Sequence, residues 1–98
     1  MEHSVSDQAA SDLDEIWLYV ARETGSLEVA TRLIDAITDT FLLLARQPLL
    51  GRSRSDDFGE GYRSLAVREY VIVYCIEAEY VVILRVVHGR RDLQSLLD

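Results

Sequence analysis

The arginines are the residues of this sequence whose type and spacing indicate a binding site. All ten basic side chains are arginine, and lysine is absent. The densest basic stretch contains Arg85, Arg90 and Arg91, with His88 between them. A guanidinium is a planar fork of donors that stays charged in proteins, so it suits bidentate recognition of a carboxylate or phosphate. We therefore expect an anion-recognising surface in this stretch, with no lysine to act as a general base.

The distribution of charge limits what such a surface could bind. Seventeen acidic residues and ten arginines give a net charge of −7; nine acids and three arginines give −6 within residues 1–46 alone. Affinity for nucleic acid comes largely from neutralised phosphates, so we expect no direct DNA binding. A basic patch on an acidic protein instead attracts and orients an anionic partner. A compositional preference for arginine would give the same count without any such role.

Two parts of the chain supply the candidates for this surface. Arg52 and Arg54 lie in a loop before the expected sheet, whereas Arg85, Arg90 and Arg91 lie at or beyond the end of its final strand. We predict that the two parts converge into one basic patch that binds the target or a partner. The full set of candidates is Arg52, Arg54, Arg63, Arg85, His88, Arg90 and Arg91. Arg63 and Arg85 could instead be bonded within the sheet, so Arg90 and Arg91 are the stronger candidates.

Other kinds of site have weak support in the sequence. His3 and His88 are far apart and Cys75 lies within an apolar run, so no spacing resembles a metal-ligand cluster. The segment 59–61 has neither a strand before it nor a helix after it, which argues against a glycine-rich phosphate loop. We expect no metal and no cofactor, and we expect Cys75 to be a buried core thiol.

Hydrophobic periodicity predicts the elements that position these residues. Residues 3–6 could pair as an edge strand. Helical spacing then begins after Ser6, a suitable N-cap, and stops at Gly25. Ser26 can cap a second helix, which must end before Pro48. Because the break between the helices is so short, they must turn back on each other as an antiparallel helical hairpin.

After the loop at 48–61 the hydrophobic period falls to two. Tyr62–Val67, Tyr70–Glu77 and Tyr80–His88 are rich in Val, Ile and Tyr, and two-residue breaks make them an antiparallel meander. Residues 90–98 are expected to form a short helical or extended tail. The chain is therefore expected to be one α+β domain over residues 1–98, with the helical hairpin packed on a three- to four-stranded antiparallel sheet. The middle strand is apolar on both faces, so we expect partial cover on its second face as well.

The longest apolar run, from Tyr70 to Ile76, is far shorter than the roughly 20 residues that a membrane span needs. No basic segment leads into an apolar stretch near the start, so we expect no secretory signal. A single cysteine cannot form an internal disulfide and suits a reducing compartment. We expect a cytoplasmic protein without a membrane segment.

Several segments together resemble the ParE/RelE family of toxins from type II toxin–antitoxin modules. They are Ser6–Trp17, Ala45–Arg52, Gly61–Val67, Tyr70–Tyr74 and Ile83–Asp92, in the order and spacing of that family. The resemblance covers nearly the whole chain. It implies a helical hairpin against an antiparallel sheet, in agreement with the periodicity.

The resemblance implies one of two activities, of which the first is enzymatic. RelE-like members are ribosome-dependent endoribonucleases that cut mRNA without a metal, using basic residues to activate the 2′-hydroxyl and stabilise the scissile phosphate. Arg63, His88 and Arg91 could supply such groups here. The position after Tyr70, an arginine in those members, is Val71. The C-terminal tyrosine of those members corresponds to Leu96 or Leu97, and lysine is absent altogether.

The second activity is inhibitory binding, and the sequence favours it. Trp17 and the segment His88–Asp92 are more similar to the ParE branch, whose members poison DNA gyrase by binding and have no established catalytic residues. The resemblance also implies neutralisation by a ParD-like antitoxin with a ribbon-helix-helix domain and a disordered C-terminal arm. Leu18 and Tyr19 lie off the apolar stripe of the first helix, so we expect them to line the antitoxin groove.

Overall fold

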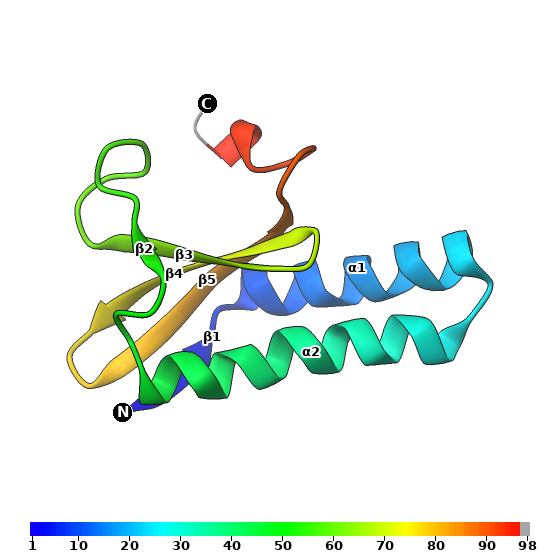
Figure 1. Cartoon of the computed structure of the whole chain (residues 1–98), viewed down its shortest axis with the longest axis horizontal. Coiled ribbons are helices and arrows are strands. Elements are labelled where there is room, and N and C mark those ends of the chain that lie inside the picture. The colour runs from blue at the N-terminus through cyan, green and yellow to red at the C-terminus, as the bar shows by residue number, and fades with distance from the viewer. Residues whose placement is uncertain (97–98) are drawn as a thin grey trace.

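The computed structural model describes residues 1–96, in which two long helices pack on one five-stranded sheet (Figure 1). The elements in chain order are β1 (Glu2–Val5), α1 (Asp7–Thr24), α2 (Leu27–Arg46), β2 (Arg52–Ser53), β3 (Tyr62–Val67), β4 (Tyr70–Glu77), β5 (Tyr80–His88) and the short 3-10 helix η1 (Gln94–Leu96). The expected α+β fold with its helical hairpin is confirmed. Leu97, one of the two positions considered for a C-terminal tyrosine, lies outside the described residues.

Both helices begin and end where the local chemistry predicts. The Ser6 hydroxyl accepts the Ala9 N–H at 3.0 Å and Ser26 accepts the Val29 N–H at 3.1 Å, so each caps a helix N-terminus. Gly25 ends α1 in the left-handed conformation, with φ of 67°, which glycine adopts without strain. Neither helix within residues 1–96 is both long enough and apolar enough to cross a membrane.

The sheet contains five strands, although three or four were expected. The meander of β3, β4 and β5 has the predicted bounds, and each of its turns contains one residue with positive φ, Arg68 or Ala78. β1 adds to one edge by pairing parallel to β5, and the two-residue β2 adds to the other edge by pairing antiparallel to β3. An Arg-Ser dipeptide has no strand propensity of its own, so β2 gave no signal in the sequence.

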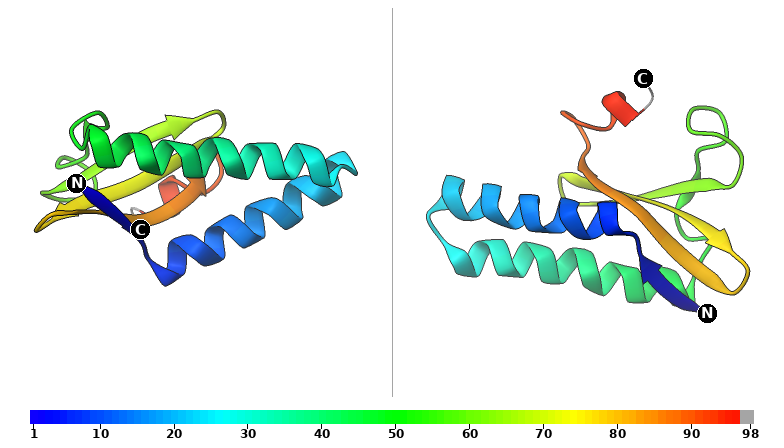
Figure 2. Two further views of the ribbon diagram at one scale, coloured as in Figure 1. Left: turned by 90° about the horizontal axis from the view of Figure 1, so that it is seen from below. Right: turned by 180° about the vertical axis from the view of Figure 1, so that it is seen from behind.

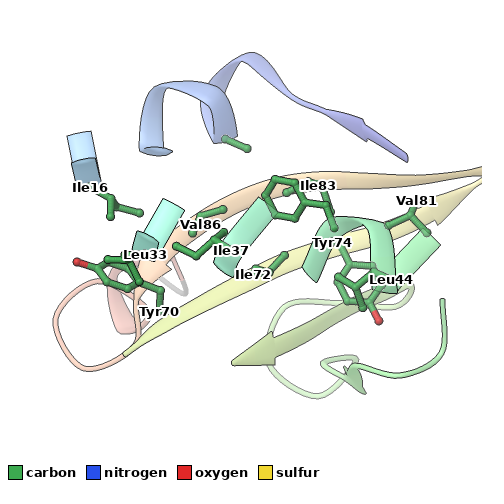
Figure 3. Packing of buried hydrophobic residues seen from close by; sticks show 12 residues of the cluster. Ile16, Leu33, Ile37, Leu44, Tyr70, Ile72, Tyr74, Val81, Ile83 and Val86 are labelled. Atoms are coloured by element: carbon green, nitrogen blue, oxygen red, sulfur yellow. The ribbon is translucent and has the colours of Figure 1, made fainter. Parts of the chain in front are cut away.

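The core lies between the sheet and the hairpin, where α2 supplies Ile37 and Leu44 (Figure 3). Phe41 of the same helix belongs to this core as well. Tyr74 of β4 is fully buried, and its hydroxyl donates to the Pro48 carbonyl at 2.8 Å. The same hydroxyl accepts the Gly51 N–H at 2.9 Å, so both of its hydrogen-bonding roles are filled. This pair of bonds fixes the chain where it leaves α2 and enters β2.

The second face of the sheet is covered by two irregular segments rather than by helices. In Figures 1 and 2 the helices lie on one side of the sheet, and the β2–β3 loop and the C-terminal segment lie on the other. Val73 and Ser64 point to this second side, since strand side chains alternate, and both are buried. The expected partial cover is therefore present.

Candidate functional site

The end of β5 is held to α1 by the buried carboxylate of Asp12. One of its oxygens accepts the Arg85 Nε–H at 2.8 Å and the Val86 N–H at 2.9 Å, and the other accepts Arg85 Nη2 at 3.1 Å. β1 ends opposite Ile83, so Asp12 satisfies backbone that has no neighbouring strand. Hydrogen bonding to Asp12 raises the pKa of Arg85. Arg85 is thus a structural residue, the alternative that the sequence had left open.

His88 ties the chain after β5 to the β3–β4 turn. Its Nδ1 accepts the Arg91 backbone N–H at 3.2 Å, while Nε2 lies 3.6 Å from the Glu69 carboxylate. Its ring meets the Tyr70 ring edge-on at 5.4 Å between centroids. Burial raises the pKa of Tyr70, against the smaller opposing effect of the Arg91 charge. The phenol therefore stays neutral at physiological pH beside a histidine that orients the following residues.

Arg91 reaches from the C-terminal segment to the surface of α1. Its guanidinium carbon lies 4.7 Å from the centroid of the Tyr19 ring, a cation–π contact worth about 0.5–1 kcal/mol at an exposed site. Arg91 is exposed and forms no ion pair within residues 1–96. The neighbouring Arg90 is also exposed, but it lines a different cavity with Ala66 and Val71.

Two cavities flank the contact between Arg91 and Tyr19. A charged cavity of about 440 Å³ lies between α1 and the C-terminal segment, and its lining includes Glu15 and Asp92. An apolar cavity of about 510 Å³ lies between the far half of the hairpin and the β3–β4 turn, where the helices extend beyond the sheet (Figure 1). Four residues line both cavities: Tyr19, Tyr70, His88 and Arg91.

The structure does not form the single basic patch that the sequence predicts. Arg85, His88 and Arg91 lie together, but Arg52 lies on β2, and two strands separate β2 from β5. With strands about 4.8 Å apart, the backbone positions of Arg52 and Arg85 are roughly 14 Å apart. Arg52 itself is exposed. It therefore forms a separate positive site at the edge of the sheet.

Arg54 is excluded from any exposed patch because it is buried within its own loop. Its Nε donates to both Asp57 oxygens at 3.0 Å, and its Nη1 donates to the Ser64 hydroxyl at 3.0 Å. Its guanidinium carbon lies 4.6 Å from the Phe58 ring centroid. These contacts build the loop that covers the second face of the sheet, so Arg54 is structural.

Arg63 is likewise occupied by main-chain acceptors. It donates from Nε to the Gly51 carbonyl at 2.9 Å and from Nη2 to the Leu49 carbonyl at 3.1 Å. Its partner on β4 is Tyr74, whereas His88 on β5 pairs with Tyr70. Four residues of strand are about 13 Å long, so Arg63 does not join His88 and Arg91 in one site.

The predicted antitoxin groove is partly found. Tyr19 lines both cavities, whereas Leu18 is exposed and lines neither. Sequence reasoning missed Val29 and Arg68, which line the apolar cavity. Val29 carried a signal, since it lies off the apolar stripe of its helix as Tyr19 does. Arg68 carried none, because a turn arginine is ordinarily a solvated side chain.

Cys75 differs from its prediction. The thiol is half-buried on the sheet face away from the helices, rather than buried in the core. Burial raises its pKa, and the nearby Glu77 carboxylate raises it further, so the thiol stays protonated. Within residues 1–96, no three side chains of His, Cys, Asp or Glu gather in a group able to hold a metal ion.

The fold and the site define a small α+β domain that presents arginines beside a groove between its helical hairpin and its sheet. The sequence matches the model of the family described as "ParE toxin of type II toxin-antitoxin system, parDE" over residues 4–93. The chain belongs to this family of ParE toxins, and the resemblance stated above is confirmed.

Two individual proteins are similar to the chain. Toxin ParE3 of Caulobacter vibrioides is 35% identical over 88 residues, which are 90% of this chain and 86% of that toxin. A solved structure described as the chromosomal ParDE TA system from P. aeruginosa superposes with a TM-score of 0.78 at 22% identity. That match covers 90% of this chain and 95% of the other. At that identity the structural match supports the fold alone.

Proposed function

We propose that the chain stops bacterial growth by binding and poisoning DNA gyrase in the cytoplasm, and that a cognate ParD-like antitoxin neutralises it. The observation that carries the proposal is the family match, which extends through the C-terminal segment that holds Arg90 and Arg91. Both arginines are exposed, and His88 fixes the turn from which they project. Exposed guanidinium groups suit the acidic surface of a protein target.

The antitoxin is expected to occupy the surface between the hairpin and the β3–β4 turn. The apolar cavity there is about 510 Å³, and Leu18, Tyr19 and Val29 are each more than 40% exposed around it or beside it on the helices. Exposed apolar surface of this kind marks an interaction site. Amphipathic arms commonly dock into such grooves.

The alternative activity, a RelE-like mRNA endoribonuclease, has less support. It would need Arg63, His88 and Arg91 to act on one phosphate, but Arg63 is bonded to the carbonyls of Gly51 and Leu49 at the other end of β3. The family match also names ParE rather than RelE. We therefore assign no catalytic residue.

Two assays with the purified chain separate these activities. We expect the chain to inhibit gyrase supercoiling of relaxed plasmid, and to leave translated mRNA uncut in primer extension. Codon-specific mRNA cuts with unimpaired supercoiling would replace this proposal by the endoribonuclease. If induction of the chain does not arrest growth, neither gyrase poisoning nor mRNA cleavage is its activity.

A further inference from the structure

Three backbone N–H groups just after β5 are bonded to His88 or to the β3–β4 turn. The Gly89 N–H donates to the Glu69 carbonyl at 2.8 Å, which joins this part of the chain to the turn. The Asp92 N–H donates to the backbone carbonyl of His88 at 2.9 Å, and the Arg91 N–H donates to Nδ1 of the His88 ring at 3.2 Å. Two of these acceptors are backbone carbonyls, but the third is a ring nitrogen that can take up a proton. The path of the chain at Arg91 therefore depends on the protonation state of a side chain.

The bond from Arg91 requires one particular state of the His88 ring. A ring nitrogen that accepts a hydrogen bond carries no hydrogen, so the ring is neutral and its single N–H lies on Nε2. Nε2 lies 3.6 Å from the Glu69 carboxylate, which is too long for a good hydrogen bond but close enough for an ion pair once the ring is charged. The ring thus has one favourable contact in its neutral state and another in its charged state.

The charges around the ring are nearly balanced. Tyr70 of β4 packs edge-on against the ring, and α2 contributes the uncharged Val29 and Leu33 to the adjoining cavities. Within residues 1–96, the titratable groups that line the cavities at His88 are five carboxylates, four guanidinium groups and two phenols: Asp12, Glu15, Glu23, Glu69, Asp92, Arg68, Arg85, Arg90, Arg91, Tyr19 and Tyr70. No strong field of one sign therefore holds the ring in either state, and the contacts at its two nitrogens distinguish them.

We propose that His88 is the positioning residue of the C-terminal arginines, and that only its neutral ring, with the hydrogen on Nε2, holds the backbone from which Arg91 projects. Protonation by solvent places a hydrogen on Nδ1, where it opposes the Arg91 N–H, so that two donors face each other and the bond is lost. The charged ring pairs with Glu69 instead. Acid thereby releases the backbone of Arg91, while the Asp92 N–H keeps its carbonyl acceptor.

This inference rests on the proposed function, because the arginines are positioned for the target proposed there. It adds a regulation of that surface by pH. Histidine changes its charge between about pH 5 and pH 8. The bond to Arg91 is therefore present at the upper end of this range and lost at the lower end.

Nitrogen-15 NMR of the wild-type chain tests the state of the ring without gyrase. The chemical shifts of the ring nitrogens identify the tautomer, and we expect the hydrogen of His88 on Nε2 at pH 8. From pH 8 to pH 5, the Arg91 amide proton should shift upfield and exchange faster with water, together with the titration of the His88 ring. The Asp92 amide is the internal control, since its acceptor is a backbone carbonyl.

A control variant and two contrary results complete the NMR experiment. His3→Gln removes the other histidine of the chain and should leave the response of the Arg91 amide unchanged. A hydrogen on Nδ1 of the neutral His88 ring would overturn the inference. An Arg91 amide that changes with pH no more than the Asp92 amide would overturn it as well.

Two variants of His88 separate positioning from a merely structural role. The amide oxygen of asparagine is bonded to Cγ, as Nδ1 of histidine is, so His88→Asn retains an acceptor for the Arg91 N–H that does not titrate. In His88→Gln the oxygen is bonded to Cδ, so that acceptor is displaced. We expect the Arg91 amide to be bonded in His88→Asn alone, and at every pH. For half-inhibition of gyrase supercoiling, we expect at least about threefold more of His88→Gln than of His88→Asn.

Thermal unfolding checks that both variants are folded, and the NMR of the wild type decides the inference even if one is not. The outcomes for the target and for the histidine are distinguishable. If the Arg91 amide follows the His88 ring but the chain leaves gyrase unimpaired, the histidine-dependent turn is supported and gyrase is not the target. If the chain inhibits gyrase and the two folded variants inhibit it equally, the target stands and the inference is overturned.

Discussion

The β2–β3 loop and the C-terminal segment each contain a cation–π contact of an arginine, but only the arginine of the loop is buried. In the loop the Arg54 guanidinium lies 4.6 Å from the Phe58 ring centroid, and in the C-terminal segment the Arg91 guanidinium lies 4.7 Å from that of Tyr19. Arg54 is buried and also bonded to a carboxylate and a hydroxyl. Arg91 is exposed, with no carboxylate partner within residues 1–96. The remaining partners, rather than the ring, decide whether an arginine supports the fold or remains open to another molecule.

The largest effect on stability should come from removing Asp12, whose carboxylate holds the end of β5 to α1. Asp12→Ala removes three hydrogen bonds and leaves Arg85 and the Val86 N–H without their acceptor. We expect the free energy of unfolding to fall by about 2–4 kcal/mol, measured by urea denaturation. Asp14→Ala, an exposed position on the same helix, serves as the control and should change it by less than about 0.5 kcal/mol. Equal free energies of unfolding for the two variants would mean that the Asp12 carboxylate does not hold α1 to β5.

A smaller loss is expected when the buried arginine of the loop is removed. Arg54→Ala breaks its bonds to Asp57 and Ser64 and exposes the Phe58 ring, so stability should fall by about 1–3 kcal/mol. The matched variant is Arg52→Ala, an exposed arginine two residues earlier, whose effect on unfolding should be near zero. If Arg54→Ala unfolds at the wild-type urea concentration, the loop does not depend on this side chain.

The ion pair between Arg54 and Asp57 should make the stability of the protein depend on pH. The hydrogen bond from Arg54 lowers the pKa of Asp57 below its ordinary value of 3.8. A lowered folded-state pKa stabilises the protein above the unfolded value, and that contribution is lost as the pH falls through the folded value. Unfolding of the wild type and Asp57→Asn should therefore differ at pH 7 and converge in strong acid. A difference that is constant from pH 7 to acid would show that the Asp57 charge has no part in it.

Local patterns predicted most of the fold. The serine caps, Gly25 and the Val, Ile and Tyr runs placed both helices and the meander, because each depends on neighbours in sequence. The edge strand expected at residues 3–6 is present as β1, whereas β2 could not be predicted, since it is a strand only by virtue of the edge it joins. A sequence pattern gives no register for a parallel edge strand that lies 78 residues from its partner, as Glu2 does from Tyr80.

The site was predicted less completely for a physical reason. An arginine's role depends on which acceptors lie within reach of its long side chain, and Asp12 is 73 residues away from Arg85. Asp57 is only three residues from Arg54, so that pair did carry a local signal. Arg90 and Arg91 were rightly separated from Arg63, whose acceptors are backbone carbonyls that no side-chain pattern marks. Their function in binding stays a prediction.

The central claim is that the exposed C-terminal arginines serve binding while the buried ones serve the fold. The most direct test is growth arrest after induction of the double variant Arg90→Ala/Arg91→Ala, together with thermal unfolding of the purified protein. Both side chains are exposed, so we expect arrest to be abolished and the free energy of unfolding to change by less than about 1 kcal/mol. Full growth arrest by the folded double variant would contradict the claim.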